Sequence, residues 1–252
     1  MKDSVCIVTG AGSGIGKATS IKLAALGARI VLSGRTSSKL EAVRKEIDTK
    51  GGLAETRPCD VSDVDETRSL VEGILRAHGR VDVLINSAGF SSKHRTTLST
   101  TLKDAEAMMG VNLIGPFFLT QAVLPSMLEC KKGTIVNVSS LAAISPSRIG
   151  GAFYSAVKSG LLNFTRYLNI ELENSGVRAC CILPGEVDTP TLKNRPVPPS
   201  PEARATMLVA GDVADAVLLA VTSPPRSLLE EITVRPSFRR DLSAELMDPS
   251  RK

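Results

Sequence analysis

Short apolar runs rich in β-branched residues alternate along the chain with longer stretches in which apolar positions recur every three or four residues. The first pattern is typical of buried strands and the second of amphipathic helices. Strands are predicted at residues 5–9, 29–33, 53–59, 81–85, 133–139, 177–183 and 231–234. Helices are predicted at residues 14–26, 38–50, 64–77, 102–128, 152–174 and 213–221.

This regular alternation predicts an α/β fold: a doubly wound, Rossmann-type parallel sheet of about seven strands with helices on both faces. Pro116 and Pro125 are expected to kink or end the long helix in which they lie. Because no internal repeat or linker divides the sequence, we expect one domain over residues 1–252. Residues 236–252 are expected to form a peripheral tail, either frayed or crossing a subunit interface.

The composition narrows the possible function classes. Hydrophobic residues make up 42% of the chain and charged residues 23%, which is typical of a globular protein. The net charge of +5 contains no block of like charges, and aromatic residues are only 3%, which argues against a nucleic-acid surface. No apolar run approaches the roughly 20 residues of a membrane span. The first residues lack the pattern of a signal peptide.

The cysteines and histidines offer little material for a metal site, and none is expected. The five cysteines form neither a CxxC motif nor a cluster with the two histidines. An odd number of scattered cysteines in a chain of this length predicts buried thiols in a reducing compartment. We therefore expect a cytoplasmic protein.

The first predicted strand runs directly into a glycine-rich turn, TGAGSGIG at residues 9–16, where a predicted helix begins. Glycine permits a tight turn and a close approach of a ligand to the backbone. The free N–H groups of a helix N-terminus attract a pyrophosphate. The strict G-x-G-x-x-G fingerprint is absent, because the spacing here is Gly10-x-x-x-Gly14-x-Gly16. The turn is a candidate dinucleotide site.

A tyrosine and a lysine, Tyr154 and Lys158, lie four residues apart in a predicted helix and therefore share one helix face. The pKa of a free tyrosine is about 10. A fixed positive charge nearby favours the phenolate and lowers that value. Such a phenol can serve as a general acid or base near neutral pH. The alternative interpretation is a solvated pair on the helix surface.

Further motifs follow the predicted elements in order: Asp60-Val61, Asn86-Ser87-Ala88-Gly89, Val111-Asn112-Leu113, Ser139-Ser140 and Pro184-Gly185-x-Val187-x-Thr189. With the glycine turn, similar to TGxxxGxG, and the Tyr-x-x-x-Lys pair, they resemble the short-chain dehydrogenase/reductase family in its compact single-domain branch. One position departs from the family pattern, because Ser87 stands in the second place of NNAG.

The resemblance implies a role for each matched residue. Tyr154 would be the general acid in carbonyl reduction, and Lys158 would lower its pKa and bind the nicotinamide ribose. Ser140 would polarise the substrate oxygen, and Asn112 would support a water-mediated proton path. Besides Tyr154 and Lys158, the implied cofactor-binding residues are Gly10, Gly12, Ser13, Gly14, Ile15, Gly16, Arg35, Asp60, Val61, Asn86, Ala88, Gly89, Pro184, Gly185, Val187 and Thr189.

The catalytic serine has two candidates, Ser139 and Ser140. The interval common in the family would place it at Leu141, so the loop before Tyr154 holds one extra residue. We select Ser140 as the nearer match. Ser139 is then interpreted as a hydroxyl at a strand end that faces the other side.

The end of the second predicted strand indicates the cofactor. Enzymes that use NAD place an acidic residue there to bind the ribose 2′-OH, whereas an arginine suits the 2′-phosphate of NADP. Here the strand ends in Ser33-Gly34-Arg35, with no acidic residue before Glu41. A guanidinium forks onto phosphate oxygens, so NADP(H) is predicted. Some NADP-dependent members carry a second basic residue where this chain has Ser13.

The resemblance implies an oxidoreductase acting on a ketone, an aldehyde, or a 3-oxo or 3-hydroxy acid, as a homodimer or homotetramer. The alternative is a non-catalytic NADP-binding sensor or scaffold, which has no need for all four catalytic residues. Residues 90–97, 141–153 and 186–207 would wall the substrate pocket, with the Pro-rich part as a lid. Lys93, His94, Arg95 and Arg148 either hold a carboxylate or phosphate or are exposed loop charges. Glu186 either contacts substrate or caps its turn.

Overall fold

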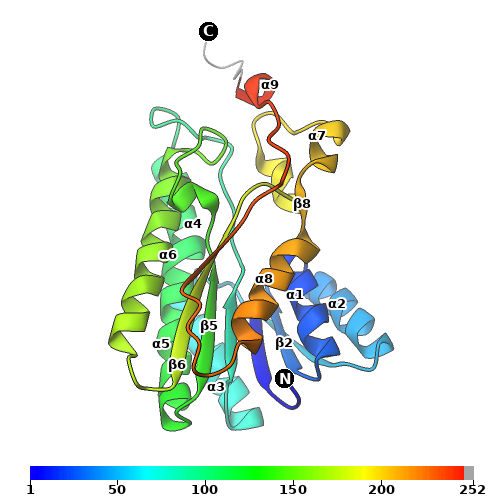
Figure 1. Cartoon of the computed structure of the whole chain (residues 1–252), viewed down its shortest axis with the longest axis vertical. Coiled ribbons are helices and arrows are strands. Elements are labelled where there is room, and N and C mark those ends of the chain that lie inside the picture. The colour runs from blue at the N-terminus through cyan, green and yellow to red at the C-terminus, as the bar shows by residue number, and fades with distance from the viewer. Residues whose placement is uncertain (247–252) are drawn as a thin grey trace.

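The computed structural model describes residues 1–246 and contains a seven-stranded parallel sheet in the order β3-β2-β1-β4-β5-β6-β9 (Figure 1). The order in which strands are added to the sheet reverses between β1 and β4. Ligands of open α/β sheets bind beyond the carboxyl ends of the strands at such a point. The predicted fold class is confirmed. The strands are β1 (Val5–Thr9), β2 (Arg29–Gly34), β3 (Leu53–Pro58), β4 (Val83–Asn86), β5 (Gly133–Val138), β6 (Val177–Pro184) and β9 (Glu231–Val234).

Helices cover both faces of the sheet, and each face has its own apolar core. On one face pack α1 (Gly14–Ala25), α2 (Ser37–Thr49) and α8 (Ala210–Thr222). On the other face pack α3 (Val64–His78), α5 (Gly115–Glu129) and α6 (Ala152–Glu171). The prediction of buried thiols is confirmed for Cys6, Cys59, Cys180 and Cys181, whereas Cys130 is exposed.

The predicted helix at residues 102–128 is a composite of three segments. Helix α4 (Leu102–Met109) passes through a π-helical turn (Gly110–Ile114) into α5. Pro116 lies in the first turn of α5, just after the π-helical turn, and does not end the composite helix. Pro125 lies inside α5 and does not end it. Residues 102–129 are long and apolar enough to cross a membrane, but their buried side chains, including Leu119 and Met127, pack in the core.

An insertion between β6 and α8 lies over the carboxyl ends of the strands, at the top of Figure 1. It contains β7 (Val187–Asp188), paired in parallel with β8 (Leu208–Val209), and the short helix α7 (Pro201–Ala205). Elements of two to five residues carry no readable periodicity, so the sequence did not predict them. The Pro-rich segment expected as a lid, residues 191–207, contains most of a 3₁₀ turn, Pro190–Asn194, and the whole of α7.

The segment after β9, expected at the periphery, runs upward to a short helix α9 (Ser243–Leu246) beside the insertion (Figure 1). Arg240 and Glu245 of this segment join Glu186 and Arg195 in a cluster of four ion-paired side chains. The side chains of Arg195, Arg240 and Glu245 are each 8–9% exposed. The tail is therefore fastened as far as Leu246, and residues 247–252 lie outside the described part.

We predict that Arg240→Met loosens the tail, because it leaves Glu186 and Glu245 each short of one buried partner. The loss should lower the stability of this segment by about 1–3 kcal/mol. Limited proteolysis should then cut the tail faster than in the wild type. The control is Arg239→Met, which removes an exposed arginine next to it. Equal cleavage rates for the two variants would contradict a fastening role for the cluster.

Candidate active site

The glycine turn after β1 packs tightly against the end of β4. A Cβ added to Gly10 would lie 2.9 Å from the Cα of Ala88, and one added to Gly16 would lie 2.5 Å from the carbonyl oxygen of Gly10. The hydroxyl of Thr9 accepts hydrogen bonds from the backbone N–H groups of Ser87 and Ala88, each at 3.0 Å. The turn that begins α1 and the motif after β4 therefore form one rigid edge.

The turn also meets the segment that follows β6. A Cβ on Gly14, which has a φ of +53°, would lie 3.3 Å from the Cγ2 of Thr189. Gly12 approaches α2, where a Cβ would lie 3.0 Å from the Cβ of Lys39. Ser13 precedes α1 in extended conformation, without a side-chain capping bond. Ile15 packs against the core of that face.

The motif after β6 is held by β9 and by Pro236, which lies two residues beyond the end of β9. The backbone N–H of Gly185 donates to the carbonyl oxygen of Val234 at 2.8 Å, and a Cβ on Gly185 would lie 3.1 Å from Pro236. Pro184 ends β6, and Val187 is buried in β7. The motif thus enters the site from the side opposite to Arg35.

Arg35 and Asp60 lie at neighbouring strand ends, with a distance of 4.0 Å between Nη1 and Oδ2. The Arg35 side chain is 71% exposed. Burial raises the pKa of Asp60, but hydrogen bonds from Ser62 and the charge of Arg35 outweigh it, so that pKa is lowered overall. Val61 is buried, and a Cβ on Gly115 of α5 would lie 2.4 Å from its carbonyl oxygen.

Asn86 lies inside the sheet. Its amide donates to Oδ1 of Asn137 at 2.8 Å, and the amide of Asn137 donates to the hydroxyl of Thr165 at 2.9 Å. This chain of amides ties β4, β5 and α6 together. Asn137 was not predicted as a site residue, because an asparagine within an apolar strand carries no motif of its own.

Asn112 projects from the π-helical turn, a feature that occurs often at functional sites. Its amide donates to the carbonyl oxygens of Met108 and Phe90, at 2.9 and 3.0 Å. Its buried Oδ1 has no hydrogen-bond partner within the described residues. A Cβ on Gly89 would lie 2.8 Å from this Oδ1 and 3.4 Å from the Nζ of Lys158. Gly89, Asn112 and Lys158 therefore converge.

Lys158 is 3% exposed, and its ammonium donates to the carbonyl oxygen of Val138 at 2.9 Å. Burial lowers the pKa of Lys158 to about 8. The Nζ lies 5.7 Å from the ring centre of Tyr154. The helix thus presents both side chains on one face, as the four-residue spacing predicts.

The hydroxyl of Ser140 faces the phenol of Tyr154, whereas the hydroxyl of Ser139 contacts the backbone of α6. Burial raises the pKa of Tyr154, and a hydrogen bond with Ser140 and the charge of Arg95 act in the opposite direction. The Ser139 hydroxyl instead donates to the carbonyl oxygen of Lys158 at 2.9 Å. In the cofactor-free protein the cation that acts on the pKa of the phenol is Arg95 and not Lys158, the residue for which the resemblance implies this role. The sequence placed Arg95 only in a pocket loop.

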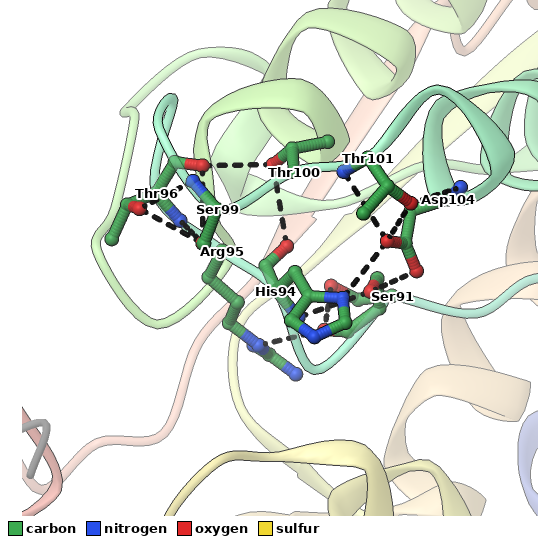
Figure 2. A network of polar contacts seen from close by, with 9 residues as sticks. Ser91, His94, Arg95, Thr96, Ser99, Thr100, Thr101 and Asp104 are labelled. Atoms are coloured by element: carbon green, nitrogen blue, oxygen red, sulfur yellow. Dashed lines mark hydrogen bonds and ion pairs between the residues drawn. The ribbon is translucent and has the colours of Figure 1, made fainter. Parts of the chain in front are cut away.

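The loop before α4 is fixed by Asp104 (Figure 2). The carboxylate of Asp104 binds Nδ1 of His94 at 2.9 Å and accepts from the Ser92 hydroxyl at 2.6 Å. These hydrogen bonds, with those of Thr101, hold the pKa of Asp104 well below its usual range. His94 thus helps to hold the loop in place through its contact with Asp104.

Two other charged residues of the pocket loops are also placed. Glu186 pairs with Arg195 and Arg240, at 2.8 and 2.6 Å, so its partners are these two arginines rather than its own turn. Lys93 is exposed and makes no ion pair with the described residues.

A known protein family and its relatives are similar to this chain over most of its length. The model of the short chain dehydrogenase family matches residues 4–198. An uncharacterized oxidoreductase of Staphylococcus saprophyticus is 36% identical over 237 residues, which cover 94% of this chain and 98% of the relative.

Solved structures give the same result. A metagenomic short-chain oxidoreductase in complex with NADP shares 36% identity at a TM-score of 0.82, over 94% of this chain and 99% of that one. Levodione reductase shares 28% identity at a TM-score of 0.86, over 94% of this chain and 97% of that one. The similarity therefore extends over the whole site.

The buried ammonium predicts a specific pH dependence of stability in the cofactor-free protein. Between about pH 8 and 10.5 the folded chain holds fewer protons at Lys158 than the unfolded chain, so stability rises with pH in that window. The Tm of the wild type minus that of Lys158→Met should therefore increase by about 2–4 °C or more from pH 7 to pH 10. Lys132→Met, at an exposed position, is the control. A difference that does not change with pH would contradict the burial of a charged lysine.

Proposed function

The chain belongs to the short-chain dehydrogenase family, and from that premise we propose that it is an NADP(H)-dependent oxidoreductase that interconverts a small carbonyl compound and its alcohol. The substrate class would be a ketone, an aldehyde, or a 3-oxo or 3-hydroxy acid. The observation that carries the proposal is the convergence of Asn112, Ser140, Tyr154 and Lys158 beside the glycine turn.

The residues present fit a dinucleotide. Glycines let the turn pack closely against the segments after β4 and β6, and the N-terminus of α1 offers free N–H groups to a pyrophosphate. Arg35 is exposed at the end of β2 and available to a 2′-phosphate. When bound, NADPH supplies a hydride from C4 of its nicotinamide ring.

The chain itself supplies hydrogen bonds and a proton. As negative charge develops on the carbonyl oxygen, the hydroxyls of Ser140 and Tyr154 donate to it, which stabilises the transition state. Tyr154 then transfers its proton to that oxygen, so the carbonyl gains one hydride and one proton and becomes an alcohol. The reverse reaction uses the tyrosinate as the base.

The proton on Tyr154 must be replaced from solvent. Lys158 has a pKa of about 8, which suits proton exchange near neutral pH. The unpartnered Oδ1 of Asn112 lies next to it and can accept a hydrogen bond from a water molecule. Asn112 would thus hold a water molecule through which Lys158 exchanges protons with solvent.

We further propose that the protein is a homodimer or homotetramer of the cytoplasm. Large apolar side chains are exposed on α5 and α6, among them Phe117, Tyr167 and Ile170. Exposed apolar patches commonly mark protein–protein contacts. The buried free thiols are compatible with a reducing compartment.

We predict that Tyr154→Phe lowers the turnover of carbonyl compounds with NADPH by about 10²- to 10⁴-fold, because it removes the general acid. The measurement is NADPH oxidation over a panel of ketones, aldehydes and oxo acids. Tyr167→Phe, which changes the exposed tyrosine of the same helix, should retain activity. Turnover unaffected in Tyr154→Phe would refute the assigned role. No turnover of any compound by the wild type would favour the alternative of a sensor or scaffold.

We predict that the wild type prefers NADPH to NADH, and that Arg35→Asp reduces this preference. The change removes a phosphate partner and adds a negative charge, and a loss of about 1.4–3 kcal/mol corresponds to about tenfold to hundredfold. The ratio of kcat/KM for the two cofactors is the measurement. Arg76→Asp, on α3 far from the strand ends, is the control. A wild type that prefers NADH would contradict the cofactor assignment.

A further inference from the structure

A small cationic pocket is lined in part by Arg95, whose charge acts on Tyr154, and it has no role in the steps described so far. It has a volume of about 50 Å³, and its charged lining consists of Arg95, Arg148, Arg195 and Glu245. A buried water needs about 10–15 Å³ of such space, so the pocket has room for a group the size of a carboxylate.

The pocket carries an excess of positive charge. Arg195 and Glu245 belong to the cluster with Arg240 and Glu186, in which two arginines face two glutamates. Arg95 and Arg148, by contrast, make no ion pair with any residue from 1 to 246 that the structure describes. The partly buried Arg95 and the exposed Arg148 therefore line the same small space without an acidic partner among the described residues.

Arg95 is held in place by backbone groups. Its Nε donates to the carbonyl oxygen of Ser92 and its Nη2 to that of Asn194, both at 3.1 Å. These bonds join the loop before α4 to the insertion after β6 and direct the guanidinium between them. Its own backbone carbonyl accepts from the N–H of Ala152 at 2.9 Å, two residues before Tyr154.

The position of Arg95 is costly without an anion. The side chain is partly buried, and burial together with the charge of Arg195 lowers its pKa to about 10. Burying a charge is unfavourable unless a counter-charge accompanies it. The nearest acid of the pocket, Glu245, already binds Arg195 and Arg240. A ligand carboxylate would supply the missing charge.

We propose that this pocket binds the carboxylate of the substrate, with Arg95 as its anchor and Arg148 as a second cation, so that the enzyme acts on oxo and hydroxy acids. The inference rests on the proposed function and names its substrate class. A carboxylate anchored at Arg95 would hold the carbonyl of the same molecule toward Ser140 and Tyr154. A monoanion fits better than a dianion such as phosphate, because Glu245 forms part of the wall.

The test compares 2-, 3- and 4-oxo acids with their methyl esters, using NADPH and the full chain. The wild type should turn over the best acid with a higher kcat/KM than its ester. Arg95→Met should lower kcat/KM for that acid, mainly through KM, by about tenfold to a hundredfold more than it lowers kcat/KM for the ester, because any change in the phenol of Tyr154 affects both substrates alike. Arg95→Lys, which keeps the charge and loses the fork, should fall between them.

Arg76→Met is the matched control and should change neither substrate, and the Tm of each variant shows whether it folds. An equal loss on acid and ester in Arg95→Met, or a wild type without preference for acids, would overturn the inference while leaving carbonyl reduction intact.

Calorimetric titration with butanoate, and separately with inorganic phosphate, tests the pocket without turnover. Butanoate should bind the wild type and Arg76→Met and bind Arg95→Met about tenfold or more weakly. Butanoate binding that is equal in all three, absent in the wild type, or weaker than that of phosphate would contradict the proposal. If no carbonyl compound is turned over, the proposed function fails, and the butanoate result still decides whether Arg95 anchors a carboxylate.

Discussion

The buried ammonium of Lys158 is the constraint around which the rest of the site is built. A charge in the interior requires polar partners, and among the described residues one carbonyl oxygen supplies a hydrogen bond to it. β5 ends where the carbonyl oxygen of Val138 meets the ammonium. The π-helical turn brings Asn112 beside it, and the glycine at position 89 leaves room for both side chains. The same helix that carries Lys158 presents Tyr154 one turn earlier.

The two sides of the site are stabilised by different interactions. On the cofactor side, glycines allow backbone segments to pack at distances that a side chain would prevent. On the substrate side, polar networks fix the loops: Asp104 fastens the loop before α4, and the cluster of Glu186, Arg195, Arg240 and Glu245 fastens the insertion and the tail. Arg95 lies between these networks, with its backbone and side chain fixed and its charge uncompensated.

The sequence predicted what local patterns specify. Strands and helices were readable from periodicity, and each motif that follows a strand reaches the same edge of the sheet because parallel strands share their carboxyl ends. Contacts between distant residues were not readable. Arg240 meets Glu186 across 54 positions, and Asn86 meets Asn137 across 51. The π-helical turn and the continuation of α5 past Pro125 also depend on tertiary packing rather than on local sequence.

Ultraviolet titration of the phenol of Tyr154 tests most directly whether this partly buried group lies where a nicotinamide ring binds. The chain has two tyrosines and no tryptophan, so Tyr167→Phe leaves a single phenol to observe. We expect this phenol to titrate above the ordinary tyrosine range in the free protein, because burial raises its pKa. Its titration should move to lower pH when NADP⁺, with its cationic ring, is added. A titration at the ordinary value that NADP⁺ does not change would contradict the account.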